Sequence, residues 1–170
     1  METIYTVIVV ILLVLAILGL VVGVSNDAVN FLNSAIGSKA ASRKVIFTIA
    51  SVGILLGTMT SSGMMEVARS GVFYPEMFTF RDVMMLFLGV MFANVILLDL
   101  FNTFGLPTST TVSLVFELLG GTFALSLIKV NNDATLALGD LINTDKALSV
   151  IMAIFVSVAI AFFFGMLVQW

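Results

Sequence analysis

The sequence predicts an all-α polytopic membrane protein with about five spans, because it is strongly apolar, sparsely charged and divided into long apolar runs. Of its 170 residues, 61% are hydrophobic and 10% are charged, and the mean hydropathy is +1.22. Soluble domains carry about 25% charged residues. We therefore expect one transmembrane domain over residues 1–170, surrounded by lipid and crossing the plasma (inner) membrane several times.

The residue types that are missing exclude several functions. The chain has no cysteine and no histidine, which removes disulfide frameworks, thiolate nucleophiles, the usual zinc sites and imidazole catalysis. The formal net charge of -3 gives no attraction for nucleic acid. A hydrolase built on a hydroxyl nucleophile would need a lysine base, and no lysine lies in the middle of a predicted span. We expect no enzyme activity, no organic cofactor and no nucleic-acid partner.

The predicted elements follow one another as apolar runs. The first run, Ile4 to Val24, has about 21 residues, which cover about 31 Å as a helix and match the hydrocarbon thickness. A signal peptide would have a shorter apolar region and a basic start, so we predict a retained helix. Four further runs are long enough to cross: residues 44–63, 83–104, 106–130 and 147–170.

Residues 25–42 are neither a clean loop nor a clean span. A carboxylate at the bilayer centre costs at least about 2.5–3.5 kcal/mol, so Asp27 must lie near the surface, be paired or line a wet cavity. Its polar neighbours recur at spacings of three and four, on one helical face: Asn26, Asn30, Asn33 and Ser34. This pattern predicts a short discontinuous or re-entrant half-helix with one face toward a cavity. The alternative is that Asp27 begins an exterior loop.

A second polar cluster lies within residues 105–121. Gly105 and Pro107 break the helix, and Pro107 suits the first position of the next one. Hydroxyl residues crowd the first turns of that helix: Ser109, Thr110, Thr111 and Ser113. A helix N-terminus has unpaired N–H groups and about half a positive charge, so these hydroxyls beside it would form an anion site without lysine or arginine. The alternative is that they bond back to their own helix and relieve a kink.

Three further polar residues fall inside predicted spans: Asn94, Asp99 and Glu117. Carboxylates that face a cavity are hard oxygen ligands for a cation such as sodium, or proton carriers. Asp99 and Glu117 are therefore additional cation-binding candidates. The alternatives are an interfacial Asp99 near a helix end and a protonated Glu117 at a helix contact. Broken helices that face a cavity, with acids nearby, are typical of secondary transporters, and the two site types together suggest symport of an anion with a cation.

At these motifs the sequence resembles the N-terminal half of the inorganic phosphate transporter (PiT) family. The first motif is Asn26-Asp27-Ala28-Val29-Asn30 followed by Gly37-Ser38-Lys39, and the second is Pro107-Thr108-Ser109-Thr110-Thr111 with Ser113. The second motif is the more specific. Their order and separation fit one half of the family, so the resemblance covers most of the chain.

The resemblance implies import of inorganic phosphate, driven by a sodium or proton gradient. It implies two inverted-topology halves that each carry both motifs, with the ion and phosphate sites between the halves. By the family pattern, Asn26, Asp27 and Asn30 bind sodium. Phosphate is held by the hydroxyls and helix ends of the second motif: Ser109, Thr110, Thr111 and Ser113.

The sequence departs from the family pattern in three places. Val24-Ser25 stands where the family has Gly-Ala, Val112 where it has histidine, and Phe116-Glu117 where it has a small residue. The missing histidine argues against histidine-based proton coupling, so sodium is the expected coupling ion, although Glu117 could carry protons. Only one copy of each motif is present. We expect the chain to be half of a longer transporter, the alternative being a chain that pairs with a second copy of itself.

These observations together predict a secondary active transporter that imports inorganic phosphate with a sodium gradient. One alternative is a proton-coupled phosphate permease or a permease for another oxyanion, such as sulfate or arsenate. A second alternative is a membrane scaffold without transport activity, in which asparagine and serine serve helix packing. The scaffold leaves Asp27 and Asp99 unexplained.

Overall fold

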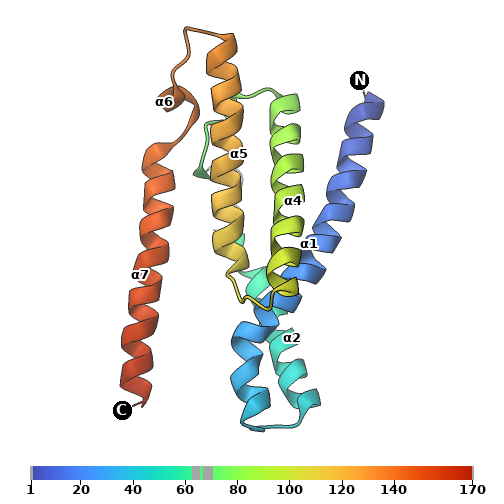
Figure 1. The fold of residues 1–170 in the computed structure, drawn as a ribbon, viewed down its shortest axis with the longest axis vertical. Helices are drawn as coiled ribbons and strands as arrows, with labels where there is room; N and C mark the ends of the chain where they lie inside the picture. The colour runs from blue at the N-terminus through green and yellow to red at the C-terminus, as the bar shows by residue number, and fades with distance from the viewer. Residues whose placement is uncertain (1, 63–65, 67–70, 170) are drawn as a thin grey trace.

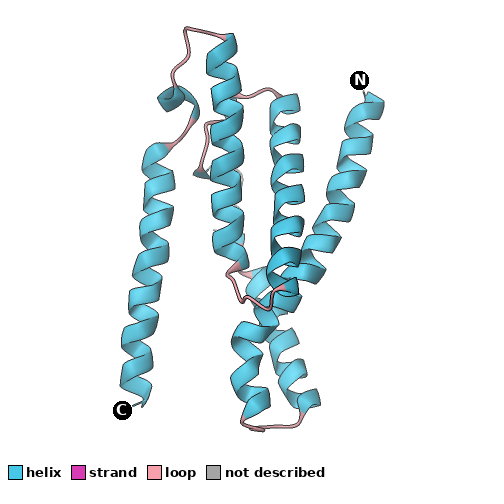
Figure 2. Cartoon of the chain, viewed as in Figure 1, coloured by secondary structure: helices cyan, strands magenta, loops and turns pink. Residues whose placement is uncertain are grey.

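The computed structural model describes residues 2–62, 66 and 71–169, which form an all-helical chain (Figure 1, Figure 2). The elements are α1 (Glu2–Gly37), α2 (Arg43–Met59), the 3-10 helix η2 (Pro75–Met77), α4 (Phe80–Thr103), α5 (Thr110–Asn132), α6 (Leu138–Leu141) and α7 (Thr144–Gln169). In the described residues, α1, α4, α5 and α7 are long and apolar enough to cross a membrane. The predicted all-α multi-pass class is confirmed, with four candidate spans instead of about five.

The difference from five spans lies at the predicted run over residues 44–63. Its helix, α2, has 17 residues, which at 1.5 Å per residue reach only about 26 Å, less than the hydrocarbon thickness of about 30 Å. Figure 1 shows α2 running back beside the lower half of α1. Gly63 and Trp170, the predicted ends of two spans, lie outside the described residues.

Helix α1 is continuous where the sequence predicts a span followed by a separate half-helix. It has 36 residues and runs through Asp27, because no glycine or proline interrupts it between Val24 and Gly37. It ends just after Gly37: Lys39 takes a positive φ of 53°, and the N–H of Ala40 donates to the carbonyl of Ala35 at 3.3 Å. The polar face therefore belongs to the second half of one long helix.

Helices α4 and α5 form an antiparallel hairpin, and α1 packs obliquely across α4 (Figure 1). A capping box starts α4: the N–H of Asp82 donates to Thr79 Oγ1 at 3.3 Å, and Thr79 N–H donates to Asp82 Oδ2 at 3.0 Å. The hairpin is closely packed at Gly121. A Cβ atom there would lie 2.8 Å from Leu86 Cδ1 and 3.2 Å from Val90 Cγ2.

We expect Gly121→Leu to lower the melting temperature of the chain in detergent, because the added side chain overpacks the α4–α5 interface at a cost of about 1–3 kcal/mol. Gly120→Leu is the matched control, since nothing lies within 4 Å of a Cβ at Gly120 and the change in helix propensity is the same. Melting followed by circular dichroism measures the difference. Equal melting temperatures for the two variants would contradict the close contact.

The end of the hairpin away from residues 104–109 is covered by two connections, residues 71–79 and 133–143. Phe73 and Ile142 form an isolated antiparallel bridge, and Phe73 and Leu141 are 1% and 0% exposed. Together with residues from α4 and α5 these connections build a core cluster: Val72, Phe73, Phe78, Leu86, Val90, Leu118, Leu141 and Ile142. These connections therefore contribute to packing as well as joining spans.

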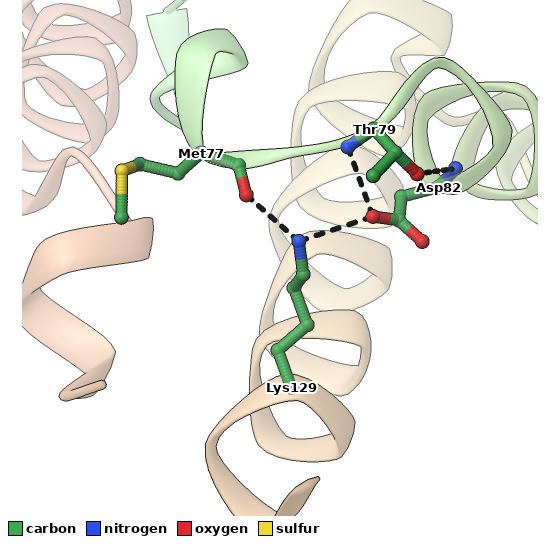
Figure 3. A network of polar contacts seen from close by, with 4 residues as sticks. All are labelled: Met77, Thr79, Asp82 and Lys129. Atoms are coloured by element: carbon green, nitrogen blue, oxygen red, sulfur yellow. Dashed lines mark hydrogen bonds and ion pairs between the residues drawn. The ribbon is translucent and has the colours of Figure 1, made fainter. Parts of the chain in front are cut away.

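Lys129 ties the last turn of α5 to the start of α4 and to η2 (Figure 3). Its Nζ lies 3.1 Å from Asp82 Oδ2 and donates to the carbonyl of Met77 at 2.7 Å. It also lies 4.9 Å from the centre of the Phe78 ring, within cation–π range. Both charged side chains are only about one quarter exposed, at 22% and 24%, so water screens the ion pair only in part.

Lys129→Met is expected to destabilise the chain by about 1–3 kcal/mol, because Asp82 loses its ion-pair partner and the Met77 carbonyl loses its donor. The methionine keeps most of the apolar stem. Lys146→Met, at an exposed position, is the control and should change stability little. Thermal melting at low and high salt measures both. A melting temperature of Lys129→Met equal to that of Lys146→Met would show that the cluster adds no stability.

Helix α7 stands apart from the hairpin (Figure 1), and Ala147 is its one buried residue in the described part of the chain. Its side chains are apolar on all sides. A helix that is apolar all round is suited to a membrane span, so α7 presents the kind of surface that lipid or further membrane helices would cover.

Candidate functional site

Asn26 of α1 forms hydrogen bonds to the end of α4 and to the connection between α4 and α5, residues 104–109. Its side chain is 3% exposed. Its Nδ2 donates to Asn102 Oδ1 at 2.8 Å and to the carbonyl of Leu106 at 3.3 Å, and its Oδ1 accepts from Thr108 N–H at 2.9 Å. The amide thus uses both donors and its oxygen within the protein.

Two further amides join the same connection to α1. Asn102 Nδ2 donates to the carbonyl of Val22 at 3.1 Å, and Asn30 Nδ2 donates to the carbonyl of Thr108 at 2.9 Å. Sequence reasoning did not identify Asn102 as a site residue. Its position in the last turn of α4, directly before the Gly105 and Pro107 break, was the available signal.

Helix α5 begins at Thr110, not at Pro107 as predicted. Ser109 is the N-cap, and its Oγ accepts from Val112 N–H at 3.3 Å. The reason for the later start is that α1 holds both backbone groups of Thr108, through Asn26 and Asn30. Gly105 permits the turn that precedes this stretch, with a φ of +66°.

The first and second motifs meet where Thr110 Oγ1 donates to Asp27 Oδ2 at 2.8 Å. Both side chains are half-buried. The backbone N–H groups of Thr110 and Thr111 are in the first turn of α5 and have no acceptor among the described residues. A carboxylate that accepts and helix N–H groups that donate therefore lie next to each other.

A cavity of about 510 Å³ opens between α1, α4 and α5 at this point. Its polar lining consists of Asp27, Ser61, Asn94, Thr110 and Thr111, and the rest of the lining is Gly19, Leu20, Gly23, Val24, Leu98 and Leu114. Gly19, Gly23 and Asp27 are four residues apart and share one face of α1, so two small residues leave room beside the carboxylate. Ser61 was not predicted. We call this space the Asp27 cavity.

The other predicted site residues lie around the Asp27 cavity without lining it. Asn26 lines a separate cavity of about 110 Å³ with Asn102 and Pro107. Asn30 and Ser109 are exposed and Ser113 is half-buried. Of the predicted phosphate and sodium residues, the cavity thus brings together Asp27, Thr110 and Thr111.

The two weaker cation candidates have different surroundings. Asp99 is exposed on α4. Glu117 is half-buried on α5, accepts from Asn94 Nδ2 at 2.9 Å and lines a second cavity of about 270 Å³. No three acidic side chains converge anywhere in residues 2–62, 66 and 71–169. A cation in the Asp27 cavity would therefore depend on hydroxyl, amide and carbonyl oxygens in addition to Asp27.

The long apolar helices and this polar cavity define a multi-pass helical membrane protein with hydrogen-bonding groups gathered between its helices. The chain belongs to the Phosphate transporter family (PHO4), whose sequence profile matches residues 22–170. This confirms the family resemblance seen in the two motifs, and the prediction of a transporter rather than an enzyme. No solved structure matches the chain.

A relative from Thermococcus kodakarensis, named "Putative phosphate permease TK2061", is 33% identical over 98 residues. The match covers 56% of this chain and 24% of that protein. The chain therefore aligns with about a quarter of the length of this relative.

Proposed function

We propose that the chain is part of a secondary transporter that imports inorganic phosphate together with sodium. The observation that carries this proposal is the hydrogen bond from Thr110 to Asp27, because it brings the cation candidate and the anion candidate into one cavity. Family membership supports phosphate as the substrate, and the name of the Thermococcus relative points in the same direction.

Phosphate would bind at the start of α5. The N–H groups of Thr110 and Thr111 have no acceptor among the described residues and are available to a bound anion at the helix start. The helix dipole favours negative charge there. Hydroxyls at the same helix start complete the proposed phosphate set: Ser109, Thr110, Thr111 and Ser113. None of the described residues that line the cavity is basic, so binding there would depend on hydrogen bonds and on a bound cation.

Sodium would bind first, at Asp27, with Asn26 and Asn30 as the other residues of the proposed sodium set. Two like charges about 4 Å apart repel by about 4 kcal/mol at an effective dielectric constant of about 20, so phosphate beside an ionised Asp27 is disfavoured until a cation neutralises it. Sodium on Asp27 would also release the Thr110 hydroxyl to donate to phosphate. The order of binding follows from these two effects.

We further propose that the chain is one half of an inverted-repeat transporter in the plasma membrane, with part of α1 and its return through α2 as a re-entrant hairpin. One copy of each motif and the unpartnered apolar surface of α7 support this arrangement. The missing half would be another segment of a longer protein, or a second copy of the chain.

Uptake of radiolabelled phosphate into liposomes tests the proposal, with the chain alone if two copies pair and with the longer protein that contains it if the missing half is another segment. We expect accumulation under an inward sodium gradient and little under choline at equal ionic strength. Accumulation that follows a proton gradient instead would favour the proton-coupled alternative, and stronger competition by sulfate or arsenate than by phosphate would favour another oxyanion. Sodium-independent binding of phosphate to the folded chain would contradict the proposed order.

A further inference from the structure

Asn94 of α4 lies between the Asp27 cavity and the cavity of Glu117. Its side chain is 8% exposed, and its Nδ2 donates to Glu117 Oε2 at 2.9 Å. Its Oδ1 accepts no hydrogen bond from the described residues. This oxygen is close to α1, since a Cβ at Gly19 would lie 3.5 Å from it. Because Asn94 and Gly19 both line the Asp27 cavity, the uncovered oxygen faces that cavity.

Glu117 holds this amide in one orientation. Because Glu117 Oε2 accepts from the NH2 group of Asn94, the amide oxygen of Asn94 is turned away from the carboxyl group. Among the described residues, the cavity around Glu117 has no other acidic, amide or hydroxyl side chain in its lining. Hard cations take about six oxygen ligands, and Glu117 alone does not supply such a set.

We propose that Asn94 is a cation ligand of the Asp27 cavity and that Glu117 is its positioning residue. This inference rests on the proposed sodium site at Asp27. Asn94 Oδ1 adds a neutral oxygen to the charged oxygens of Asp27, and the hydroxyls of Ser61 and Thr110 line the same space. Sodium prefers oxygen ligands of this kind, and one carboxylate with neutral oxygens suits a monovalent charge.

The experiment measures sodium binding to the full chain in detergent as thermal stabilisation, without phosphate, by replacing choline with sodium at constant ionic strength. Asn94→Leu, which keeps the branching and the number of heavy atoms but removes the oxygen, is expected to weaken sodium binding about 10-fold or more. Glu117→Leu should weaken it about 10-fold, as losses of residues that orient metal ligands do. Glu117→Gln should bind nearly as the wild type does, because its amide oxygen still accepts from Asn94 Nδ2. Asp145→Asn, at an exposed position in the first turn of α7, is the control.

A second pair of variants serves if Asn94→Leu does not fold. Gly19→Ala places a methyl group 3.5 Å from Asn94 Oδ1, an ordinary contact that allows folding but partly covers the oxygen. Gly89→Ala, which has open space at the Cβ and lines the cavity of Glu117, is its control. We expect weaker sodium binding for Gly19→Ala alone.

The outcomes separate this inference from the proposed function. Wild-type sodium binding that is lost in Asp27→Asn but unchanged in Asn94→Leu or Gly19→Ala would overturn the role of Asn94 and leave the sodium site standing. Equal losses in Glu117→Gln and Glu117→Leu would overturn the positioning role, because the charge itself would then be required. If sodium does not stabilise the wild type, the proposed sodium coupling fails together with this inference.

Discussion

Asp27→Asn is expected to reduce sodium-driven phosphate uptake by about 100-fold or more. Asparagine has nearly the shape of aspartate, and its Oδ1 can still accept from Thr110 Oγ1, so the contact between α1 and α5 is kept. The variant loses only the negative charge. A unit charge about 4 Å from a cation contributes about 4 kcal/mol at an effective dielectric constant of about 20, and 1.4 kcal/mol is a factor of about ten in binding.

The measurement is phosphate uptake into liposomes over a range of sodium concentrations, with the helix content of each variant checked by circular dichroism. Asp145→Asn is the matched control, since it makes the same chemical change at an exposed position in the first turn of α7. We expect Asp145→Asn to transport at the wild-type rate. If both variants transport at the wild-type rate, Asp27 takes no part in coupling.

The separate roles of Asp27 and of Thr110 and Thr111 could be anticipated from sequence, because each motif carries a distinct chemistry. A lone carboxylate in an apolar run requires a wet or paired environment, and hydroxyls after a Gly-Leu-Pro break indicate a helix start. Contact between the two motifs followed only from the family resemblance. Nothing local in either motif specifies a partner 83 residues away.

The continuity of α1 was not predictable from the same pattern. Polar residues at spacings of three and four mark one face of a helix, and that face looks the same whether the helix begins at Ser25 or passes through it. Whether the helix continues through Ser25 depends on the hydrogen-bond partner of each amide side chain. Asn26 and Asn30 bond to the connection around Thr108 and leave their own backbone helical, so no break is needed.

The start of α5 was misplaced for a related reason. Proline is favoured in the first turn of a helix when the residues around it are free to join it. Here the backbone of Thr108 is held from α1, more than 75 residues earlier in the chain, and Ser109 caps the helix instead. Asn102 and Ser61 were missed because single polar residues at helix ends are usually solvated.

The burial of residues in the connections 71–79 and 133–143 could not be predicted from the sequence. Both connections are short and mix apolar with polar residues, so their apolar side chains gave no periodic signal. Phe73 and Leu141 are nevertheless buried, because the bridge between Phe73 and Ile142 places both connections over the end of the α4–α5 hairpin. Burial of this kind depends on which loops meet, which the local pattern does not contain.

Asn26 holds the connection between α4 and α5 against α1 through its hydrogen bonds. Asn26→Leu is therefore expected to destabilise the chain by about 3–5 kcal/mol. The substitution leaves three polar groups without their partner: Asn102 Oδ1, the carbonyl of Leu106 and the N–H of Thr108. Each such buried group costs about 1–3 kcal/mol when it is unsatisfied, and leucine cannot replace any of the bonds.

Transport should be lost with stability in Asn26→Leu, because the connection that Asn26 holds leads directly into Thr110 and Thr111 of the Asp27 cavity. Denaturant unfolding of the chain in micelles measures the loss. Asn30→Leu is the control: its amide makes one hydrogen bond, to the carbonyl of Thr108, from an exposed position, and should cost about 1 kcal/mol or less. A variant Asn26→Leu that unfolds like the wild type would contradict this structural role. A loss of sodium binding in that variant would then come from the place of Asn26 in the proposed sodium set alone, and its hydrogen bonds to the connection would be incidental to folding.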